Sequence, residues 1–586
     1  MNMLIFLLPF VVSLAASTIS KRAGYILLIV SSMLLAGYAI LLAGLTTLTF
    51  FYLISAIVLI LASWYSIGYD KHHGWLAPMF TAAALGIAII LLSKNFLEFL
   101  AGWELMSVSG YLMIGMYKKN SGPAFVFSAY GELSTIFIIA GMAYAYVLTG
   151  TFNFVAIPSA IPLALVAIGF FVKMGVFPFA ISDWLPVAHS SAPANSSAIL
   201  SALMTLMGVY GIVRIALLSP SSIPLGIMLM AIGAFTVFFA ALLEYVSENT
   251  KVLLGYSTVE NNGAILIAIG LMIANPAGIA AAFVVSTILM LCLAHSVGKT
   301  GLFLISGSFA SERLESINNA KENKATFGII LASASLSGLL PTIGGVGIWM
   351  LLESLFMTAA VSPAWLGIAA IIIGALVALG ETVASGAMVK FISFTQLFKN
   401  LNGTNPVNTY PVLLAGILVV VLGVVSVFLI NNSFISGNSA VGIPNGLLIA
   451  SLTGAGATFG VVSPVFVACI ICLFTVLVLL IFGRPKIKRV PVWNNGVERA
   501  DAYTSFAFAN NIRIMMGGIL RTKHDATRKE DATRNPFWAP VVMIAGLYKE
   551  NARKITWNLM NSSMRWYISY IVIAFVFVMV FVIVTS

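Results

Sequence analysis

Nine ionisable residues lie within apolar stretches of the sequence that are long enough to cross a bilayer: Glu104, Glu132, Lys173, Glu260, His295, Lys299, Glu353, Glu381 and Lys390. A charged side chain in hydrocarbon costs about 2.5–3.5 kcal/mol on insertion scales, so each residue needs an opposite charge or water. Desolvation disfavours the ammonium form of a lysine, and a nearby glutamate restores it. Acids that alternate with lysines could therefore carry protons, although a single buried residue is as often one half of a structural pair.

The spacing of these residues indicates where they meet. Lys173 is followed by Pro178, Pro186 and Pro193, and a proline inside a helix frees carbonyl groups that only protein or water can satisfy in a membrane. His295 and Lys299 stand four residues apart, so they share one helix face and could exchange a proton. We therefore expect a broken helix at Lys173 and a relay face on a second helix.

A stripe of hydroxyl groups is a further candidate. Ser197, Ser201 and Thr205 follow the i, i+4, i+8 pattern of one helix face. They could line a hydrated path, or each hydroxyl could bond the carbonyl one turn earlier. The sequence leaves both interpretations open.

The composition indicates a polytopic membrane protein. Of the 586 residues, 60% are hydrophobic and 8% are charged, and the mean hydropathy is +1.04. Soluble domains carry roughly 25% charged residues, so neither a soluble domain nor nucleic-acid binding is expected. Cys469 and Cys472 form a C-x-x-C inside an apolar run without a second pair, so we expect no metal site.

About sixteen apolar runs reach the roughly 20 residues needed to span a bilayer: 2–19, 23–45, 49–68, 75–93, 95–117, 122–149, 155–182, 193–217, 223–246, 252–273, 277–308, 325–357, 363–397, 409–430, 459–483 and 566–585. The first run precedes Lys21 and Arg22 and is interpreted as a spanning helix rather than a cleaved signal. Most loop lysines and arginines follow odd-numbered runs, which predicts cytoplasmic basic loops with both termini outside. The connection 484–564 belongs to this basic side.

That connection, extended to Arg565, holds fifteen of the thirty Lys and Arg residues against six acids. It could dock on an acidic partner or on anionic headgroups, but an ordinary cytoplasmic anchor explains the charge equally simply. Aromatic residues within it favour short helices at the membrane surface.

Two interrupted runs suggest an internal duplication. The twelfth run contains Pro341 and a group of glycines, and it lies five runs after the Lys173 run. Two inverted five-helix units with broken fourth helices would place an ion site at mid-membrane, with Lys173 and Glu353 at related positions. We accordingly divide the chain into 1–74 (N-terminal helices), 75–220 and 221–400 (the two repeats), 401–483 (C-terminal core helices), 484–564 (the basic connection) and 565–586 (the last helix).

Four ordered motifs carry a family resemblance: FLAGWELMSVSGYLMIG (99–115), VKMGVFPF with WLPVAH (172–179, 184–189), NTKVLLGYSTVENNG (249–263) and HSVGKTGLFLISGS (295–308). They resemble the antiporter-like membrane subunits of complex I, of energy-converting hydrogenases and of multisubunit cation/proton antiporters. SGAMVKFISFTQLF (385–398), with the tail segments 490–517 and 558–580, most resembles the long subunit of the formate hydrogenlyase and hydrogenase-4 type.

The resemblance implies an all-α protein with a fourteen-helix core and a proton path. Glu104, Lys173, Lys299 with His295, and Lys390 match the family's path residues. The usual base of the eighth segment is missing, and Glu353 lies a turn beyond the usual acid of the twelfth. Glu132 and Glu260 depart from the family pattern. Ser201, from the hydroxyl stripe, and Glu132 are the remaining residues of the candidate proton path.

The sequence therefore predicts a proton-translocating, or sodium-translocating, subunit of a redox complex in the plasma membrane. No cofactor is expected in this chain; partner subunits would carry iron–sulfur clusters and a metal or quinone site. Expected partners are other membrane subunits and a peripheral redox arm, and no homo-oligomer is indicated. The alternatives are a subunit of a multisubunit Na⁺/H⁺ antiporter without redox partners and a scaffold that does not pump.

Overall fold

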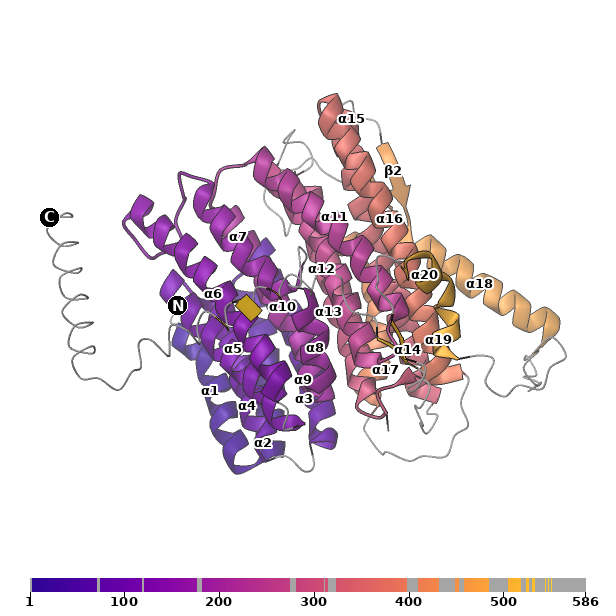
Figure 1. The fold of residues 1–586 in the computed structure, drawn as a ribbon, viewed down its shortest axis with the longest axis horizontal. Helices are drawn as coiled ribbons and strands as arrows, with labels where there is room; N and C mark the ends of the chain where they lie inside the picture. Colours follow the sequence, from indigo (N-terminus) through magenta and orange to yellow (C-terminus); the bar gives the residue numbers. More distant parts are fainter. Residues whose placement is uncertain are drawn as a thin grey trace, which may run out of the picture. The chain divides into compact units, whose positions relative to one another are not determined.

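The computed structural model describes residues 3–70, 74–118, 121–176, 182–274, 281–309, 311–314, 323–397, 409–431, 448–452, 458–483, 504–517, 523–525, 530–532, 543, 546–547 and 550 (Figure 1). The chain divides into two units, Met1–Met515 and Met516–Ser586. In the second unit, β3 (Lys523–Asp525) pairs antiparallel with β4 (Glu530–Ala532). All further elements belong to the first unit.

The first half of this unit is a bundle of apolar helices. Its elements are α1 (Met3–Ile19), α2 (Lys21–Gly37), the π-turn η1 (Tyr38–Leu42), α3 (Thr47–Tyr69), α4 (Leu76–Leu92), α5 (Phe96–Tyr117), α6 (Ser121–Thr149), α7 (Ile161–Met174), α8 (Trp184–Ser191), α9 (Ala194–Ile199), the π-turn η3 (Leu200–Met204) and α10 (Thr205–Ala216). The last three form one continuous helical path through the interior.

The second half adds α11 (Ile223–Val246), α12 (Thr250–Ala274), α13 (Ala281–Ser306), α14 (Asn323–Leu336), α15 (Ile343–Val361), α16 (Ala364–Ile392), the π-turn η5 (Ser393–Leu397), α17 (Tyr410–Asn431), α18 (Pro464–Phe482), α19 (Ser505–Phe508) and α20 (Asn510–Met515). Helices α12 and α13 contact both halves: α8, α3 and α9 on one side, and α15 and α17 on the other (Figure 1). They therefore occupy the centre of the unit.

The expected class, a helical protein that crosses the membrane many times, is confirmed. Twelve described helices are long and apolar enough to span, and α1, α4, α7 and α14 are shorter apolar helices. The predicted run 566–585 lies outside the described residues, so the counts of sixteen spans and fourteen core helices stay predictions. The same holds for the inverted repeat and the domain limits.

Both expected breaks are present. The seventh run is interrupted after α7, and the twelfth is divided into α14 and α15. Pro178 lies outside the described residues. Lys173 precedes the first break, whereas Glu353 follows the second break and lies within α15. The two residues therefore do not hold equivalent positions relative to the breaks.

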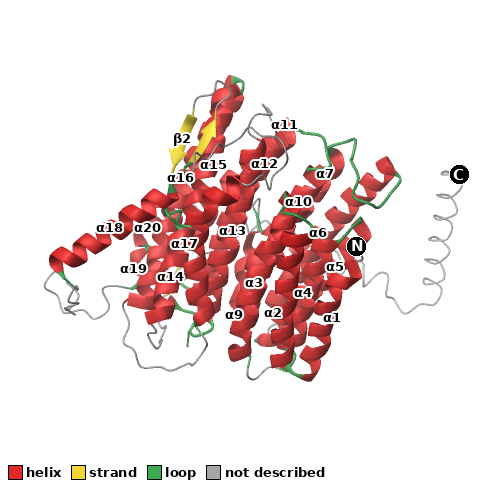
Figure 2. Cartoon of the chain, turned by 180° about the vertical axis from the view of Figure 1, so that it is seen from behind, coloured by secondary structure: helices red, strands yellow, loops and turns green. Residues whose placement is uncertain are grey.

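A short antiparallel hairpin corrects one predicted boundary. β1 (Ile449–Leu452) pairs with β2 (Thr458–Val462), and α18 begins only at Pro464 (Figure 2). The predicted helix 459–483 is therefore too long at its start. Thr458 and the valines at 461 and 462 are β-branched and favour a strand, whereas Pro464 suits the first turn of a helix.

Close backbone contact joins α11 to α12. A Cβ atom on Gly233 would lie 2.7 Å from the carbonyl oxygen of Gly263, and one on Gly263 would lie 2.9 Å from the carbonyl oxygen of Gly233. Small residues of this kind allow membrane helices to pack at short range. The contact fixes how the acids farther along both helices lie relative to each other.

Candidate functional site

Lys173 lies in the last turn of α7, at the break in the helix. Gly175 ends α7 in the left-handed conformation (φ +68°), and the amide of Val176 donates to the carbonyl oxygen of Phe171 at 3.1 Å. Glycine adopts this conformation without a Cβ penalty. The local sequence thus explains why the helix stops one residue after Lys173.

Two side chains from other helices satisfy carbonyl groups at this break. Trp184 Nε1 donates to the oxygen of Val172 at 2.9 Å, and Asn262 Nδ2 donates to the oxygen of Met174 at 2.7 Å. Backbone groups without partners are costly in a membrane, so these bonds stabilise the break. Asn262 belongs to α12 and therefore links the break to the central helix.

Lys173 is buried, with 2% of its surface exposed. Its Nζ donates to Ser107 Oγ at 2.9 Å and lies 4.7 Å from the ring centroid of Phe127 and 5.4 Å from that of Trp103. Aromatic faces attract a desolvated ammonium. Within the described part of the chain, no carboxylate forms an ion pair with this nitrogen. The lysine is held by a hydroxyl and two rings rather than by a direct salt bridge.

The two acids that act electrostatically on Lys173 lie farther away. Glu104 on α5 is half-buried and accepts a hydrogen bond from Thr135 Oγ1 at 2.8 Å. Glu132 on α6 is exposed. α6 is rotated so that Gly131, Ser134 and Thr135 face the interior, and the place of Glu132 in the candidate path stays a prediction.

His295 and Lys299 share one face of α13, as their spacing predicts. His295 is 1% and Lys299 0% exposed. The His295 Nε2 lies 3.3 Å from the carbonyl oxygen of Ser201, and Lys299 Nζ donates to the carbonyl oxygen of Leu254 at 3.3 Å. The pair is therefore positioned between η3 and α12.

The hydroxyl stripe takes both forms that the sequence left open. Thr205 Oγ1 donates to the Ser201 carbonyl one turn earlier, whereas Ser201 Oγ and Thr258 Oγ1 share a hydrogen bond of 2.7 Å across two helices. Ser197 Oγ is buried and has no hydrogen-bond partner within the described part of the chain. Ser201 thus contacts both α12, through its hydroxyl, and His295, through its carbonyl.

Two buried acids act on Lys299, and a third acid acts on both of them. Glu244 on α11 and Glu260 on α12 are both 0% exposed, and both attract the ammonium of Lys299. Glu381, on α16, is half-buried, and its carboxyl group interacts electrostatically with that of Glu260. Two neighbouring carboxyl groups repel each other when both are charged, which favours a proton on one of them.

The two lysine environments are connected through α12. Asn262 contacts the break beside Lys173, Thr258 contacts Ser201 next to His295, and the carbonyl oxygen of Leu254 binds Lys299. These three residues are spaced four apart and lie on one face of the helix. No hydrogen bond joins Lys173 directly to His295 or Lys299 in the described residues, whereas this face of α12 contacts both environments.

Lys390 belongs to a different group at the end of α16. Its side chain is 0% exposed, and its Nζ donates to the carbonyl oxygens of Tyr245 (3.1 Å) and Ser247 (2.9 Å) and to Glu248 Oε1 (2.9 Å). Glu248 also pairs with Arg513 Nη2 at 2.6 Å and accepts a hydrogen bond from Ser505. The lysine expected at mid-membrane therefore lies two residues before the end of α16, and Glu248 connects it to α19 and α20.

A second ionic group lies at the other end of the α11–α12 turn. Glu312 pairs with Lys118 at 2.9 Å and with Lys251 at 3.1 Å. Burial opposes ionisation of both Glu312 and Glu248, but their cationic partners outweigh it and hold the pKa of each carboxyl below its ordinary value. These loops, which the charge pattern assigns to one side of the membrane, thus contact one another.

Glu353 is buried in α15 beneath the β hairpin. A Cβ atom on Gly460 would lie 2.6 Å from Glu353 Oε2, so only glycine lets β2 approach the carboxyl group this closely. Thr287 on α13 and Ser354, the next residue of α15, share a hydrogen bond of 3.3 Å. Glu353 therefore lies on a helix in contact with the relay helix α13, but no described hydrogen bond joins it to Lys299.

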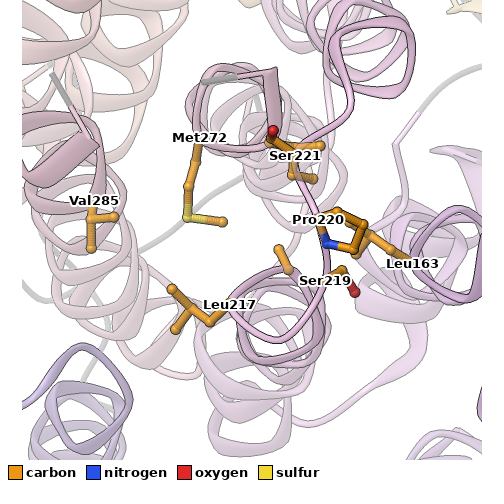
Figure 3. A pocket seen from close by; sticks show the side chains of 9 residues that line it. Leu163, Leu217, Ser219, Pro220, Ser221, Met272 and Val285 are labelled. Carbon is orange, nitrogen blue, oxygen red and sulfur yellow. The ribbon is translucent and has the colours of Figure 1, made fainter. Parts of the chain in front are cut away.

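One cavity of about 250 Å³ lies where α7, α10, α12 and α13 end or begin (Figure 3). Leu163, Leu217, Met272 and Val285 line it together with the serines of the α10–α11 loop. No titratable side chain lines it, so it contributes no proton carrier. The described residues contain no group of three or more His, Cys, Asp or Glu side chains able to hold a metal ion.

Sequence reasoning missed four residues that the fold brings to these groups. Glu244, Glu248 and Glu312 stand near segment ends, where acids are ordinary in loops. His189 was part of the WLPVAH motif and is 0% exposed. Its ring stacks on that of Phe303 with the centroids 4.4 Å apart, and the charges of Lys251 and Lys299 act on it. Glu244 and His189 are buried, and Glu248 and Glu312 half-buried, only because of which helices meet, and the sequence carries no local signal of this.

Comparison with known proteins finds a family model that matches part of the chain. Residues 93–329 match the family model described as "NADH:quinone oxidoreductase/Mrp antiporter, TM". This part of the chain is similar to the transmembrane region that the model describes. The resemblance predicted from the motifs is thereby confirmed. The matched range includes Glu104, Lys173, His295 and Lys299 but not Glu353 or Lys390.

Individual relatives include proteins of the kinds that the family model describes. The chain is 27% identical over 381 residues to "Hydrogenase-4 component B" of Escherichia coli K12, covering 59% of this chain and 55% of that protein. It is 26% identical over 328 residues to "NADH-quinone oxidoreductase subunit N" of Desulforudis audaxviator, covering 52% and 63%. The chain thus spans between about half and two thirds of these relatives.

A solved structure resembles the fold along nearly the whole chain. A chain of the membrane-bound sulfane sulfur reductase, described as an archaeal respiratory membrane complex, superposes with a TM-score of 0.79 at 18% identity. The match covers 99% of this chain and 100% of that one. The similarity establishes a shared fold, including parts beyond residues 93–329.

Proposed function

We propose that this chain translocates protons across the plasma membrane as a subunit of a multisubunit redox complex. The observation that carries the proposal is the row of ionisable side chains buried in central helices: Lys173, His295, Lys299 and Glu260 are each at most 2% exposed. Such residues are costly in a membrane and mark ion paths by default. The match to a family model described for quinone oxidoreductases and Mrp antiporters supports a function in ion movement.

The proposed route has two halves joined by α12. Glu104 and Lys173 form the first half, and a change in the strength of their interaction loads or releases the proton of Lys173. Asn262, Thr258 and Ser201 lead to His295 and Lys299. The carboxyl pair of Glu260 and Glu381 then accepts the proton, and Glu353 and Lys390 are the candidate sites beyond it.

Coupling to electron transfer is the second part of the proposal. Relatives named as hydrogenase-4 component B and NADH-quinone oxidoreductase subunit N support a redox complex over a Na⁺/H⁺ antiporter without redox partners. Iron–sulfur clusters and a metal or quinone site would then belong to partner subunits in a peripheral arm.

The test uses the complete complex reconstituted in vesicles with a pH-sensitive dye inside. Lys173→Met and Lys299→Met should each lower proton movement per electron about tenfold or more while electron transfer continues. Lys324→Met is the matched control, because that lysine is exposed at the start of α14. A sodium-selective dye in the same vesicles distinguishes the two ions.

Two results would contradict the proposal. Unchanged proton movement in both lysine variants would favour a scaffold that does not pump. Ion exchange by the chain's complex without any electron donor would favour the antiporter alternative.

A further inference from the structure

The face of α6 that points away from the protein carries a carboxylate near the middle of the helix. α6 has 29 residues, Ser121–Thr149, so its midpoint is residue 135 and Glu132 lies three residues, or about 4.5 Å, from it. Glu132 is exposed, and so are Phe125 (70%), Ile136 (63%) and Val147 (74%). This surface, the Glu132 face, is therefore apolar except at its centre.

Lipid is a poor cover for such a face. Hydrocarbon strongly disfavours a carboxylate at mid-depth, and the side chain of glutamate is too short to reach the headgroups from there. None of the described residues donates a hydrogen bond to Glu132. Lys173 attracts it, but that ammonium lies inside the bundle and is bonded to Ser107.

We propose that the Glu132 face binds a transmembrane helix of a different subunit, and that this helix presents a lysine, arginine or histidine to Glu132. Charge complementarity identifies the chemistry of the partner. Small exposed residues beside Glu132 and along the same face, Ala129, Ala140 and Ala143, allow a helix to approach closely.

A second copy of this chain does not supply that cation. The exposed lysines in the described residues, such as Lys94, Lys118 and Lys324, stand at or next to helix ends rather than at mid-depth. Lys173, Lys299 and Lys390 are buried. Among the described residues, a second copy thus offers no exposed lysine at mid-depth, and the proposal commits to a helix from another subunit.

This interface would connect the partner to the proposed proton path, and this step rests on the proposed function. Glu132 stabilises the ammonium of Lys173 through their attraction. A partner cation beside Glu132 offsets part of that attraction, so movement of the partner helix toward Glu132 favours release of the proton from Lys173.

The first experiment places a photo-crosslinking amino acid at Ala129 or Ala140 of the full chain in native membranes that contain the whole complex. The expected product joins this chain to another membrane subunit, within one helical turn of a lysine, arginine or histidine, as located by peptide mass spectrometry. Adducts to lipid alone, to a second copy, or to a helix without such a residue would overturn the proposal.

The second experiment exchanges the charges. Glu132→Lys should lower retention of the partner subunit on purification about tenfold, and Glu132→Gln, which still accepts a hydrogen bond, should lower it less. Reversal of the partner's cation to glutamate should restore retention with Glu132→Lys. Ile136→Leu is the control on the same face. Absence of rescue would overturn the proposal, and the crosslinks with native Glu132 decide the question if Glu132→Lys fails to fold.

These readouts separate the interface from the proton path. Lys173→Met should leave the crosslinks unchanged whether or not it abolishes proton movement. Specific crosslinks together with unaffected proton movement in Lys173→Met would support the interface and refute the proposed function. Absent crosslinks together with lost proton movement would refute the interface and support the proposed function.

Discussion

Replacement of Glu248 by glutamine leaves Lys390 and Arg513 without the counter-charge that they share. Both cations are buried, with side chains 0% and 4% exposed, and Glu248 itself is 26% exposed. Arg513 belongs to α20, so this carboxylate connects the last part of the first unit to the α11–α12 turn. We expect the variant to loosen the segment Thr504–Met515 before it affects the rest of the bundle.

The magnitude follows from what remains after the substitution. Removal of one partner from a buried ion pair costs about 3–5 kcal/mol. Here Lys390 keeps two carbonyl acceptors, Arg513 keeps the carbonyl oxygens of Phe506 and Val246, and Glu248 is partly solvated. We therefore expect about 2–3 kcal/mol, which corresponds to roughly a 30- to 160-fold change in local opening at about 1.36 kcal/mol per decade.

Hydrogen exchange of the amides of Thr504–Met515, in the purified full chain in nanodiscs, measures this opening. Glu312→Gln is the control, because it disrupts the neighbouring ionic group and should leave this segment protected. A double-mutant cycle of Glu248→Gln with Arg513→Met should give a coupling energy of at least about 1 kcal/mol. Protection that falls less than threefold, or additive effects in the cycle, would refute the reasoning.

Three further predictions concern the same structure. Because the pKa of Glu248 in the folded protein lies below its ordinary value of about 4.3, its stabilisation is complete above that value and is lost as pH falls through the lowered pKa, so exchange of the segment at 504–515 should accelerate only in acid. Ser201→Ala should lower proton movement about tenfold in vesicles if the hydroxyl shared with Thr258 lies on the path, whereas Thr258→Ser, which keeps the hydroxyl, should retain it. Gly263→Ala should destabilise the protein by about 1–3 kcal/mol in thermal unfolding, because its Cβ meets the backbone of α11, while Gly131→Ala meets no described atom within 4 Å and should not.

Hydropathy and helix-breaking residues predicted most of the fold. The runs 95–117 and 223–246 correspond to Phe96–Tyr117 and Ile223–Val246 almost residue for residue. This works because a membrane helix must satisfy its backbone internally over a fixed thickness. The break at Gly175 and the division between α14 and α15 were predictable for the same reason, since proline and glycine there cannot continue a buried helix.

The rotation of each helix was not predictable in the same way. Glu132 and Thr135 are one turn apart on α6, yet Glu132 is exposed while Thr135 is 7% exposed and bonds Glu104. In a soluble helix a polar stripe marks the outer face, but in a membrane both faces are apolar and composition gives no direction. Glu244 and Glu248 were missed on similar grounds, because only the packing of α11 against α12 and α16 buries Glu244 and brings Glu248 to Lys390.

The arrangement of α12 explains how a path could persist although the usual base of the eighth segment is absent. Leu254, Thr258 and Asn262 contact Lys299, Ser201 and the Lys173 break respectively, at intervals of one helical turn. A single helix face therefore touches both lysine environments, and it does so through a carbonyl, a hydroxyl and an amide rather than through charged groups. These groups can bond water but cannot hold a proton, so a transfer between the lysines requires water along this face. It follows that Thr258→Val, which preserves shape and removes the hydroxyl, should block proton transfer between the Lys173 and Lys299 environments. The protonation of Lys299 should then depend only on the acids Glu244 and Glu260.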